Sequence, residues 1–373
     1  MRFLIVSHVV HKQVGNSFFA YGPYVKEMNL WLRYVDEVVI LAPKVENLSP
    51  DPIDLAYQHS KITFVEVHEF NLLSWKSRIQ TVFSLPSIFL NVISEMAKAD
   101  HIHLRCPGNM GLVGALAQIM FPRKKKTAKY AGNWDPESHQ PLTYKWQRKI
   151  LSSQLLTKNI QVLVYGKWSN SNKNLLHFFT ASYSDQEKIP VAPRILQEPL
   201  QLIFVGSLHP GKNPLISCHV VKSLLEKGIS SELHLYGEGQ ERMAIEEFVN
   251  SEKLQKHIIL HGNVSSEELK KAYQKSHFLV FASESEGWPK AVAEAMFWGC
   301  LPLTTKVSCV PDMIGNGERG DLVGKDAQEI GDRIGYYIQN QSSYYQKVQL
   351  AMDWSREFTL EKFEMEIKKL ILN

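Results

Sequence analysis

Residues 278–296 read FLVFASESEGWPKAVAEAM, which is an apolar run followed by a polar turn and the start of a helix. The apolar run at residues 278–281 predicts a buried strand. Gly287 can take backbone angles closed to other residues, and Pro289 suits the first helical position, where its missing N–H costs nothing. Strand, turn and helix in this order indicate an α/β fold.

The helix start in this segment predicts an anion site, because unpaired amides and the helix dipole both favour negative charge there. Glu286 stands just before the helix, and Lys290 and Glu294 share one helix face at a spacing of four. We expect the segment to bind a diphosphate flanked by two polyols. The alternative is two solvated carboxylates at a helix end, since Glu238 and Glu246 repeat the spacing of eight in a surface-like segment.

Apolar strands alternate with helical stretches along the whole chain. The expected strands lie at residues 3–7, 37–42, 62–67, 101–105, 127–131 and 161–165, and then at 202–206, 232–236, 257–260, 278–281 and 301–304. This pattern predicts two Rossmann-like, doubly wound α/β domains facing a central cleft. Prolines restrict the backbone around residues 191–198 and predict the linker there, so the domains are expected at residues 1–190 and 199–353.

The composition, 44% hydrophobic and 21% charged residues over a length of 373, is typical of a soluble globular protein and excludes disordered and collagen-like classes. The four cysteines lack the paired spacings of zinc sites and disulfide frameworks. The opening apolar run stops at Ser7, which is too short for the core of a signal peptide, and the longest apolar stretch is too short to span a membrane. We therefore expect a cytoplasmic protein.

Basic residues outnumber acidic ones up to Pro190, and the reverse holds after it. They concentrate in Arg123-Lys124-Lys125-Lys126 and at Lys129. This cluster either steers an anionic partner, such as a phospholipid surface or a lipid-diphosphate acceptor, or forms a solvated loop before a strand. The stretch from Trp75 to Leu90 is a second candidate for peripheral contact with the inner face of the cell membrane, and its alternative is an ordinary core helix.

Polar and glycine-rich turns follow several expected strands, at the edge where ligands bind in such sheets. The first turn, residues 7–16, contains Gly15 and has polar atoms that can meet a phosphate or an acceptor. Lys212 follows the strand that ends at Gly206 and stands near a helix start, so its ammonium can reach a phosphate. Gly237 and residues 261–264 mark further turns, which either let a flat base reach backbone atoms or are plain tight turns.

Segments of the second half resemble, in order, the retaining, nucleotide-sugar-dependent glycosyltransferases of the GT-B fold, specifically the large family four that builds bacterial surface glycans. These segments are residues 204–212, 235–239, 261–264, 285–294 and 317–320. The first half resembles the family only in its strand order and in the loop around Gly15. By analogy with the family, the amphipathic stretch of residues 354–373 is expected to form a helix that crosses back to the first domain.

The resemblance implies roles for individual residues. Glu294 would bind the ribose hydroxyls of the donor nucleotide, Glu286 the hydroxyls of the transferred sugar, and Lys212 would neutralise the leaving diphosphate. Backbone amides beside the proline of the turn would face sugar and diphosphate, and no metal or other cofactor is then expected. The other implied donor-binding positions are Gly206, Ser207, Gly237, Val264, Gly287, Trp288, Pro289 and Lys290.

Two positions depart from the family pattern. Ser207 stands where the family usually has an arginine, so a second phosphate-binding cation would have to come from Arg319 or from the first domain. Asn133 or Asp135 stands where family members commonly have a first-domain histidine. Asp135 can serve as the acceptor base, or it can cap the helix after it.

The sequence thus predicts transfer of a sugar from a nucleoside diphosphate sugar to a hydroxyl of a glycan or lipid-linked acceptor, with retained anomeric configuration, in bacterial polysaccharide or lipopolysaccharide synthesis. Retaining hydrolases place a nucleophilic carboxylate near the reacting carbon. The expected cleft shows no obvious equivalent, which favours front-face displacement. Two alternatives remain open: a nucleotide-sugar epimerase or hydrolase on the same scaffold, and a non-catalytic nucleotide-sugar-binding subunit. No nucleic-acid partner is expected.

Overall fold

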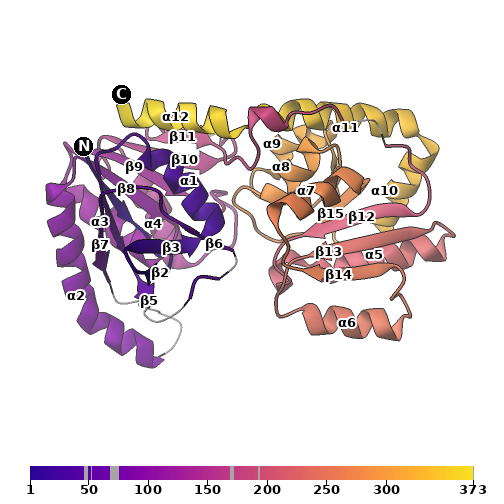
Figure 1. The fold of residues 1–373 in the computed structure, drawn as a ribbon, viewed down its shortest axis with the longest axis horizontal. Helices are drawn as coiled ribbons and strands as arrows, with labels where there is room; N and C mark the ends of the chain where they lie inside the picture. Colours follow the sequence, from indigo (N-terminus) through magenta and orange to yellow (C-terminus); the bar gives the residue numbers. More distant parts are fainter. Residues whose placement is uncertain (46–48, 52, 68–74, 169–171, 192–193, 373) are drawn as a thin grey trace. The chain divides into compact units, whose positions relative to one another are not determined.

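The computed structural model describes residues 1–45, 49–51, 53–67, 75–168, 172–191 and 194–372, with the side chains of residues 75–84 outside this description. The chain forms two compact units (Figure 1). The first comprises Met1–Phe179 together with the terminal stretch from Phe363, and the second comprises Thr180–Lys362. Helix α12 (Leu360–Leu372) therefore begins in the second unit and continues into the first.

The first unit is built on a seven-stranded parallel sheet in the order β11-β10-β9-β8-β1-β4-β7. All six strands expected in this half are present within a few residues of their predicted bounds, and β11 is an addition. The strands are β1 (Arg2–Val6), β4 (Glu37–Ala42), β7 (Ile62–Glu66), β8 (His101–Cys106), β9 (Lys125–Tyr130), β10 (Ile160–Tyr165) and β11 (Leu175–Phe178). The helices that begin and end in this unit are α1 (Gly22–Leu32), α2 (Trp75–Lys98), α3 (Asn109–Ala117) and α4 (Leu142–Ser152).

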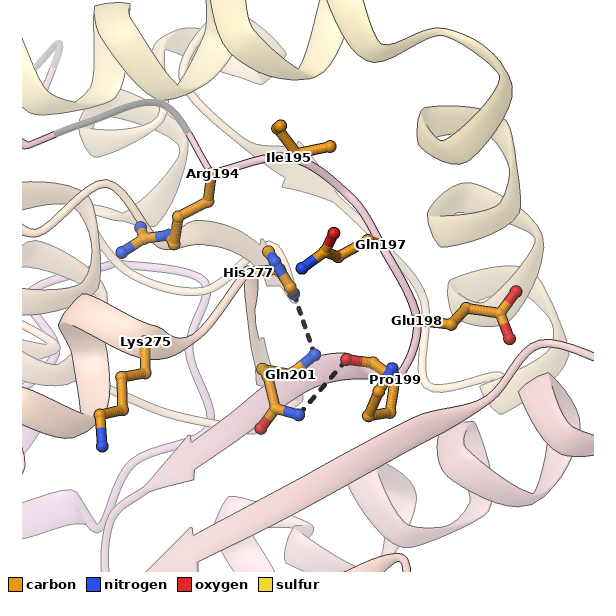
Figure 2. Close-up of a pocket in the computed structure, with 8 residues that line it drawn as sticks. All are labelled: Arg194, Ile195, Gln197, Glu198, Pro199, Gln201, Lys275 and His277. Carbon is orange, nitrogen blue, oxygen red and sulfur yellow. Dashed lines mark hydrogen bonds between the residues drawn. The ribbon is translucent and has the colours of Figure 1, made fainter.

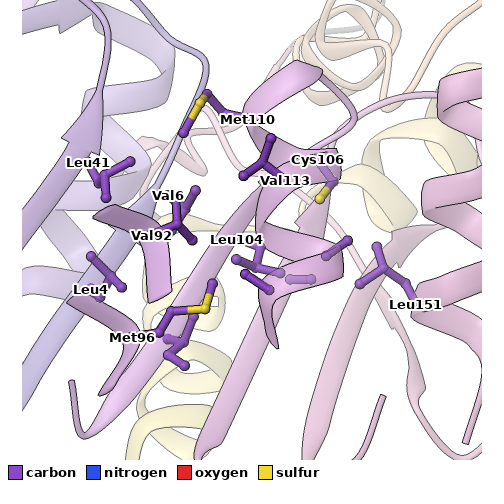
Figure 3. Packing of buried hydrophobic residues seen from close by; sticks show 14 of the residues in the cluster. Leu4, Val6, Leu41, Val92, Met96, Leu104, Cys106, Met110, Val113 and Leu151 are labelled. Carbon is purple, nitrogen blue, oxygen red and sulfur yellow. The ribbon is translucent and has the colours of Figure 1, made fainter. Parts of the chain in front are cut away.

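A continuous hydrophobic core lies between this sheet and its helices (Figure 3). Val6 on β1 and Leu104 on β8 are paired in register, and both side chains are fully buried. Val92 and Met96 of α2 and Val113 of α3 belong to the same core cluster. A strand that is buried on both faces has apolar residues at almost every position, and this is why the sequence predicted these strands.

A small second sheet interrupts the predicted loop after β1. Its order is β5-β2-β3-β6, with β2 (His11–Val14), β3 (Ser17–Tyr21), β5 (Lys44–Val45) and β6 (Asp54–Ala56). Val14 pairs with Ser17, so Gly15 and Asn16 form a two-residue hairpin turn, and Gly15 has a φ of 58° that suits glycine. The segment is therefore a hairpin of a polar strand, β2, and a largely apolar strand, β3, both too short to show a clear alternation in the sequence.

The prediction of a solvated loop at residues 123–129 is wrong, whereas steering of an anionic partner stays a prediction that rests on exposed Arg123 and half-buried Lys124 and Lys125. Strand β9 begins within it, and Lys126 and Lys129 are almost fully buried. The Nζ of Lys126 donates to the backbone oxygen of Phe121 at 2.6 Å, and the Nζ of Lys129 lies 2.9 Å from a carboxylate oxygen of Glu27. Long lysine stems pack well in a core when the ammonium finds an acceptor.

The second candidate membrane segment forms part of helix α2. Trp75, Lys76, Arg78 and Phe83, on which that prediction depended, have side chains outside the described residues. Farther along the helix, Ile88 and Phe89 pack in the core of the first unit, as an ordinary core helix would. No helix in the described part of the chain is long and apolar enough to cross a membrane.

The second unit contains a six-stranded parallel sheet in the order β14-β13-β12-β15-β16-β17. Its strands are β12 (Leu200–Val205), β13 (Ser231–Tyr236), β14 (Ile258–Gly262), β15 (Phe278–Phe281), β16 (Leu301–Thr304) and β17 (Asp321–Leu322). The helices are α5 (Pro214–Glu226), α6 (Arg242–Ser251), α7 (Ser266–Lys275), α8 (Lys290–Phe297), α9 (Val310–Met313), α10 (Ala327–Gln339) and α11 (Gln341–Ser355). The strand order reverses direction between β12 and β15, so their carboxyl ends form the topological switch point where ligands bind in such sheets.

The boundary between the units lies at Phe179 and Thr180, which is earlier than the predicted linker at residues 191–198. The reason is that the intervening segment packs on the second unit. The ring of Tyr183 lies 5.3 Å from that of Trp298, and the guanidinium of Arg194 donates to the backbone oxygen of Trp298 at 2.9 Å. The prolines thus mark a segment attached to the second unit and not the point of division.

Candidate active site

Lys212 and Glu286 meet at the switch point of the second sheet. Lys212 ends a short 3-10 helix (Pro210–Lys212) after β12, and Glu286 lies in the turn after β15. The Lys212 Nζ forms an ion pair with the Glu286 Oε1 and lies 5.4 Å from the ring centre of Phe281. The Glu286 side chain is 8% exposed and the Lys212 side chain 26%, so solvent reaches the pair mainly from the lysine side.

Hydrogen bonds between the two loops fix this arrangement. The backbone oxygen of Gly211 accepts from the amide of Glu284 at 2.9 Å and from the hydroxyl of Ser283 at 3.3 Å. The side-chain amide of Asn213 donates to the backbone oxygen of Ala282 at 2.9 Å. The ion pair therefore lies between two loops that are joined by hydrogen bonds, and these bonds fix the distance between the backbones that carry Lys212 and Glu286.

The turn that carries Glu286 is also tied to the loop after β16. The Thr305 hydroxyl donates to the backbone oxygen of Ser283 at 2.5 Å, and the Ser308 hydroxyl donates to that of Gly287 at 3.0 Å. The loops that follow β12, β15 and β16 are thus joined by hydrogen bonds at one edge of the sheet. Such an edge can hold a polar ligand with little rearrangement.

One predicted donor-site glycine, Gly237, has a steric role where the turn after β13 meets the turn after β12. A Cβ atom on Gly237 would lie 1.9 Å from the backbone oxygen of Gly206, and Gly237 has a φ of 136°. The amide of Gly206 donates to the backbone oxygen of Tyr236 at 3.0 Å, which draws the two turns together. Glycine is needed here because the two backbones are in direct contact.

Helix α8 begins one residue later than predicted, because Pro289 is its N-cap residue and Lys290 its first residue. The indole of Trp288 stacks on Trp354 of α11 with ring centres 6.1 Å apart. The Trp288 side chain therefore anchors the turn to α11. A donor-binding role for backbone groups of Gly287, Trp288 and Lys290 stays a prediction.

Glu294 lies farther along α8 and is half-buried. Its Oε1 accepts a hydrogen bond from the Ser182 hydroxyl at 2.5 Å, and its Oε2 accepts one from the Tyr273 hydroxyl at 3.2 Å. Burial, and then the Glu294 charge, raise the pKa of Tyr273 well above its ordinary value, so this hydroxyl stays protonated. Sequence reasoning missed Ser182 and Tyr273, and no spacing links either residue to Glu294.

The remaining donor-side predictions have separate outcomes. Ser207 is exposed and Val264 is half-buried, both in loops after strands of the second sheet. Arg319 donates to the backbone oxygens of Met313 and Asp312 at 3.0 and 2.8 Å, and its guanidinium lies over the ring of Trp354. These contacts give Arg319 a packing role between α9 and α11, and its phosphate-binding role stays a prediction.

The predicted first-domain residues all lie in the first unit. Gly15 is at the exposed tip of the β2–β3 hairpin. The side-chain oxygen of buried Asn133 accepts from the amide of Asp135 at 2.9 Å, and a carboxylate oxygen of Asp135 accepts from the amide of Glu137 at 2.9 Å. The next helix, α4, has Pro141 at its N-cap, so Asp135 stabilises its own turn and does not cap that helix.

A cavity of about 480 Å³ lies at the opposite edge of the second sheet (Figure 2). His277 precedes β15 and Gln201 lies near the start of β12, so the cavity is at the amino ends of these strands, away from Lys212 and Glu286. Burial and the nearby Arg194 charge lower the pKa of His277 to about 4, and its Nδ1 accepts from the amide of Gln201 at 3.0 Å. The lining residues are Arg194, Ile195, Gln197, Glu198, Pro199, Gln201, Lys275 and His277.

Residues 185–354 match the family model described as glycosyl transferases group 1. The match covers 170 of the 373 residues. The matched segment contains Lys212, Glu286 and Glu294, and with them the switch point of the second sheet. The predicted resemblance of the second half of the chain is therefore confirmed at the level of the family.

A curated relative and two solved structures extend this result. An uncharacterized glycosyltransferase of Methanocaldococcus jannaschii is 28% identical over 169 residues, which are 45% of this chain and 46% of the relative, so the match spans about half of that protein. Sucrose-phosphate synthase of Thermosynechococcus elongatus superposes with a TM-score of 0.69 at 16% identity, over 99% of this chain and 98% of that one. HepE of Anabaena in complex with UDP-glucose superposes with a TM-score of 0.67 at 12% identity, over 99% of this chain and 98% of that one. These likenesses confirm the GT-B fold of two parallel-sheet α/β units.

Proposed function

We propose that the protein is a retaining glycosyltransferase that moves a sugar from a nucleoside diphosphate sugar to a hydroxyl group. The observation that carries the proposal is the Lys212–Glu286 pair at the switch point of the segment that matches the glycosyl transferases group 1 model. Glu286 provides acceptors for sugar hydroxyls, and Lys212 provides a cation for the diphosphate. HepE, which has the same fold, was solved with UDP-glucose, and this supports a nucleotide-sugar donor.

In the proposed reaction the bond between the sugar carbon and the diphosphate oxygen breaks as the acceptor oxygen attacks the same face of the sugar. The acceptor proton passes to the leaving phosphate. Lys212 stabilises the negative charge that develops on the diphosphate, and a fixed cation at a partly buried site does this well. Because Glu286 forms an ion pair with Lys212, donor binding has to place the diphosphate beside an ammonium that already has a partner. The proposal assigns charge neutralisation to this lysine and not to a metal ion.

The acceptor is proposed to be a glycan or a lipid-linked glycan in bacterial polysaccharide synthesis at the inner face of the cell membrane. The support is the family resemblance of residues 204–320. Asp135 remains a candidate residue on the acceptor side, since its turn holds the carboxylate in a defined position.

The test is turnover by Glu286→Ala with a donor identified by thermal shift against uridine, guanosine and adenosine diphosphates and their sugars. We expect transfer to be lost while the melting temperature stays close to that of the wild type. Wild-type turnover by this variant would contradict the proposal. Products formed from donor alone would indicate the epimerase or hydrolase instead, and nucleotide-sugar binding without any product would indicate the non-catalytic subunit.

A further inference from the structure

The carboxylate of Glu294 is held from both of its oxygens by hydroxyl groups. Ser182 donates to Oε1 at 2.5 Å, and Tyr273 donates to Oε2 at 3.2 Å. Ser182 lies in the segment by which the chain enters the second unit, Tyr273 is on α7, and Glu294 is on α8. Three segments far apart in the sequence therefore meet at one side chain.

Both hydroxyl donors are themselves fixed in place. The Tyr273 side chain has no exposed surface, and burial together with the Glu294 charge raises its pKa well above the ordinary value, so it remains a donor. The ring of Tyr183, next to Ser182, lies 4.8 Å from Phe297 and 5.3 Å from Trp298. These ring contacts hold the segment that carries Ser182 next to the end of the helix that carries Glu294.

We propose that Ser182 and Tyr273 are positioning residues that orient the Glu294 carboxylate toward the vicinal hydroxyls of the donor ribose. The inference rests on the proposed function, in which Glu294 binds that ribose. An ionised carboxylate has about four lone-pair sites, so Glu294 can accept from a diol while it accepts from the two hydroxyls. Because the Glu294 side chain is already held in one rotamer, ribose binding loses less side-chain conformational entropy, which favours the binding free energy.

The test compares a ribonucleotide with its dideoxy counterpart. Titration calorimetry with uridine, guanosine and adenosine diphosphates first selects the nucleotide that the wild type binds most tightly, and the 2′,3′-dideoxy form of that nucleotide is then titrated. We expect Ser182→Ala and Tyr273→Phe each to reduce the ribose-over-dideoxyribose preference about tenfold, a loss typical of one hydrogen bond to a charged group. Affinity for the dideoxy form should not change, which a purely structural defect would not achieve.

Matched controls exist for both variants. Ser184→Ala removes a nearby serine whose hydroxyl takes part in a local capping box with Glu187. Tyr344→Phe removes a buried tyrosine hydroxyl that donates to the backbone oxygen of His277 at 3.2 Å. Both controls should keep the wild-type preference for ribose.

The possible outcomes are distinguishable. If the wild type prefers ribose and both variants keep that preference, or bind the ribonucleotide more tightly, the positioning role is wrong while the proposed function stands. If the wild type binds no nucleoside diphosphate, the proposed function and this inference fall together. If Tyr273→Phe fails to fold, Ser182→Ala still tests the positioning role, because the Ser182 side chain is only partly buried.

Discussion

The two units each contain a lysine–glutamate pair, and the pairs differ in where the lysine lies. In the first unit Lys129 is within strand β9, 2% exposed, and 2.9 Å from Glu27 on α1. In the second unit Lys212 is in a loop after β12, 26% exposed, and paired with Glu286. A buried pair within a strand belongs to the core, whereas a pair at a strand end remains accessible to a ligand.

The surroundings of the two lysines support this contrast. The Lys129 ammonium lies 4.7 Å from the ring centre of Phe363, 5.4 Å from Phe178 and 5.6 Å from Tyr165. Phe363 belongs to the part of α12 that packs in the first unit, so Lys129 helps to hold this helix on the sheet. The Lys212 ammonium lies 5.4 Å from the ring centre of Phe281, at the end of strand β15.

The largest effect on stability is expected at the buried pair. Lys129→Ala should lower the free energy of unfolding by about 3–5 kcal/mol, because it removes the nearer cation of the buried Glu27 carboxylate and leaves Arg105 at 4.0 Å from the same oxygen. Urea denaturation monitored by circular dichroism measures this loss. The control is the double variant Lys129→Met with Glu27→Leu, which removes both charges and should recover much of the stability. A single variant as stable as the wild type would break the comparison.

The next largest effect is expected where the switch-point turns touch. Gly237→Ala should destabilise the second unit by about 2–4 kcal/mol, since the new Cβ would overlap the backbone oxygen of Gly206. Gly228→Ala is the control, because Gly228 has a φ of 77° but no atom within 4 Å of an added Cβ. Both substitutions put alanine at a positive φ, so the difference between the two melting temperatures measures the cost of the steric overlap at Gly237. Equal losses would show that the close approach does not fix the turns.

The smallest effect is expected at an exposed pair on the same edge of the second sheet. Lys325 lies 2.6 Å from Glu284, with side chains 48% and 53% exposed. Lys325→Ala should change the unfolding free energy by less than about 1 kcal/mol, as is usual for solvated ion pairs. Turnover should also be unaffected, and this completes a series from buried to exposed lysine–glutamate pairs. A loss of transfer in this variant would extend the active site to Glu284.

The sequence predicted the sheets better than it predicted the contacts. Strands such as Glu37–Ala42 and Phe278–Phe281 have the predicted bounds, because a strand buried on both faces is a continuous apolar run. The hairpin around Gly15 and strand β11 were missed, although β3 and β11 are short, largely apolar segments. The burial of Lys126 was missed because its acceptor, the backbone oxygen of Phe121, is set by the fold.

The candidate site was predictable only in part. Lys212 and Glu286 were named from the sequence, but their contact follows from the strand order, which places β12 beside β15. The hydroxyl donors to Glu294 come from positions 21 and 112 residues away, and no local pattern reveals them. The packing of Arg319 against α9 and Trp354 was likewise not predictable, because these partners are brought to it by the fold.

The central claim is that the lysine at the switch point is catalytic and the lysine in β9 is structural. Turnover of Lys212→Met, measured with the identified donor on protein shown to be folded, tests it most directly. We predict that the variant stays folded, with some loss of stability because the Glu286 side chain is only 8% exposed, and that turnover falls about 10²- to 10³-fold, the range for loss of one group that stabilises developing negative charge. Turnover close to that of the wild type would contradict the claim.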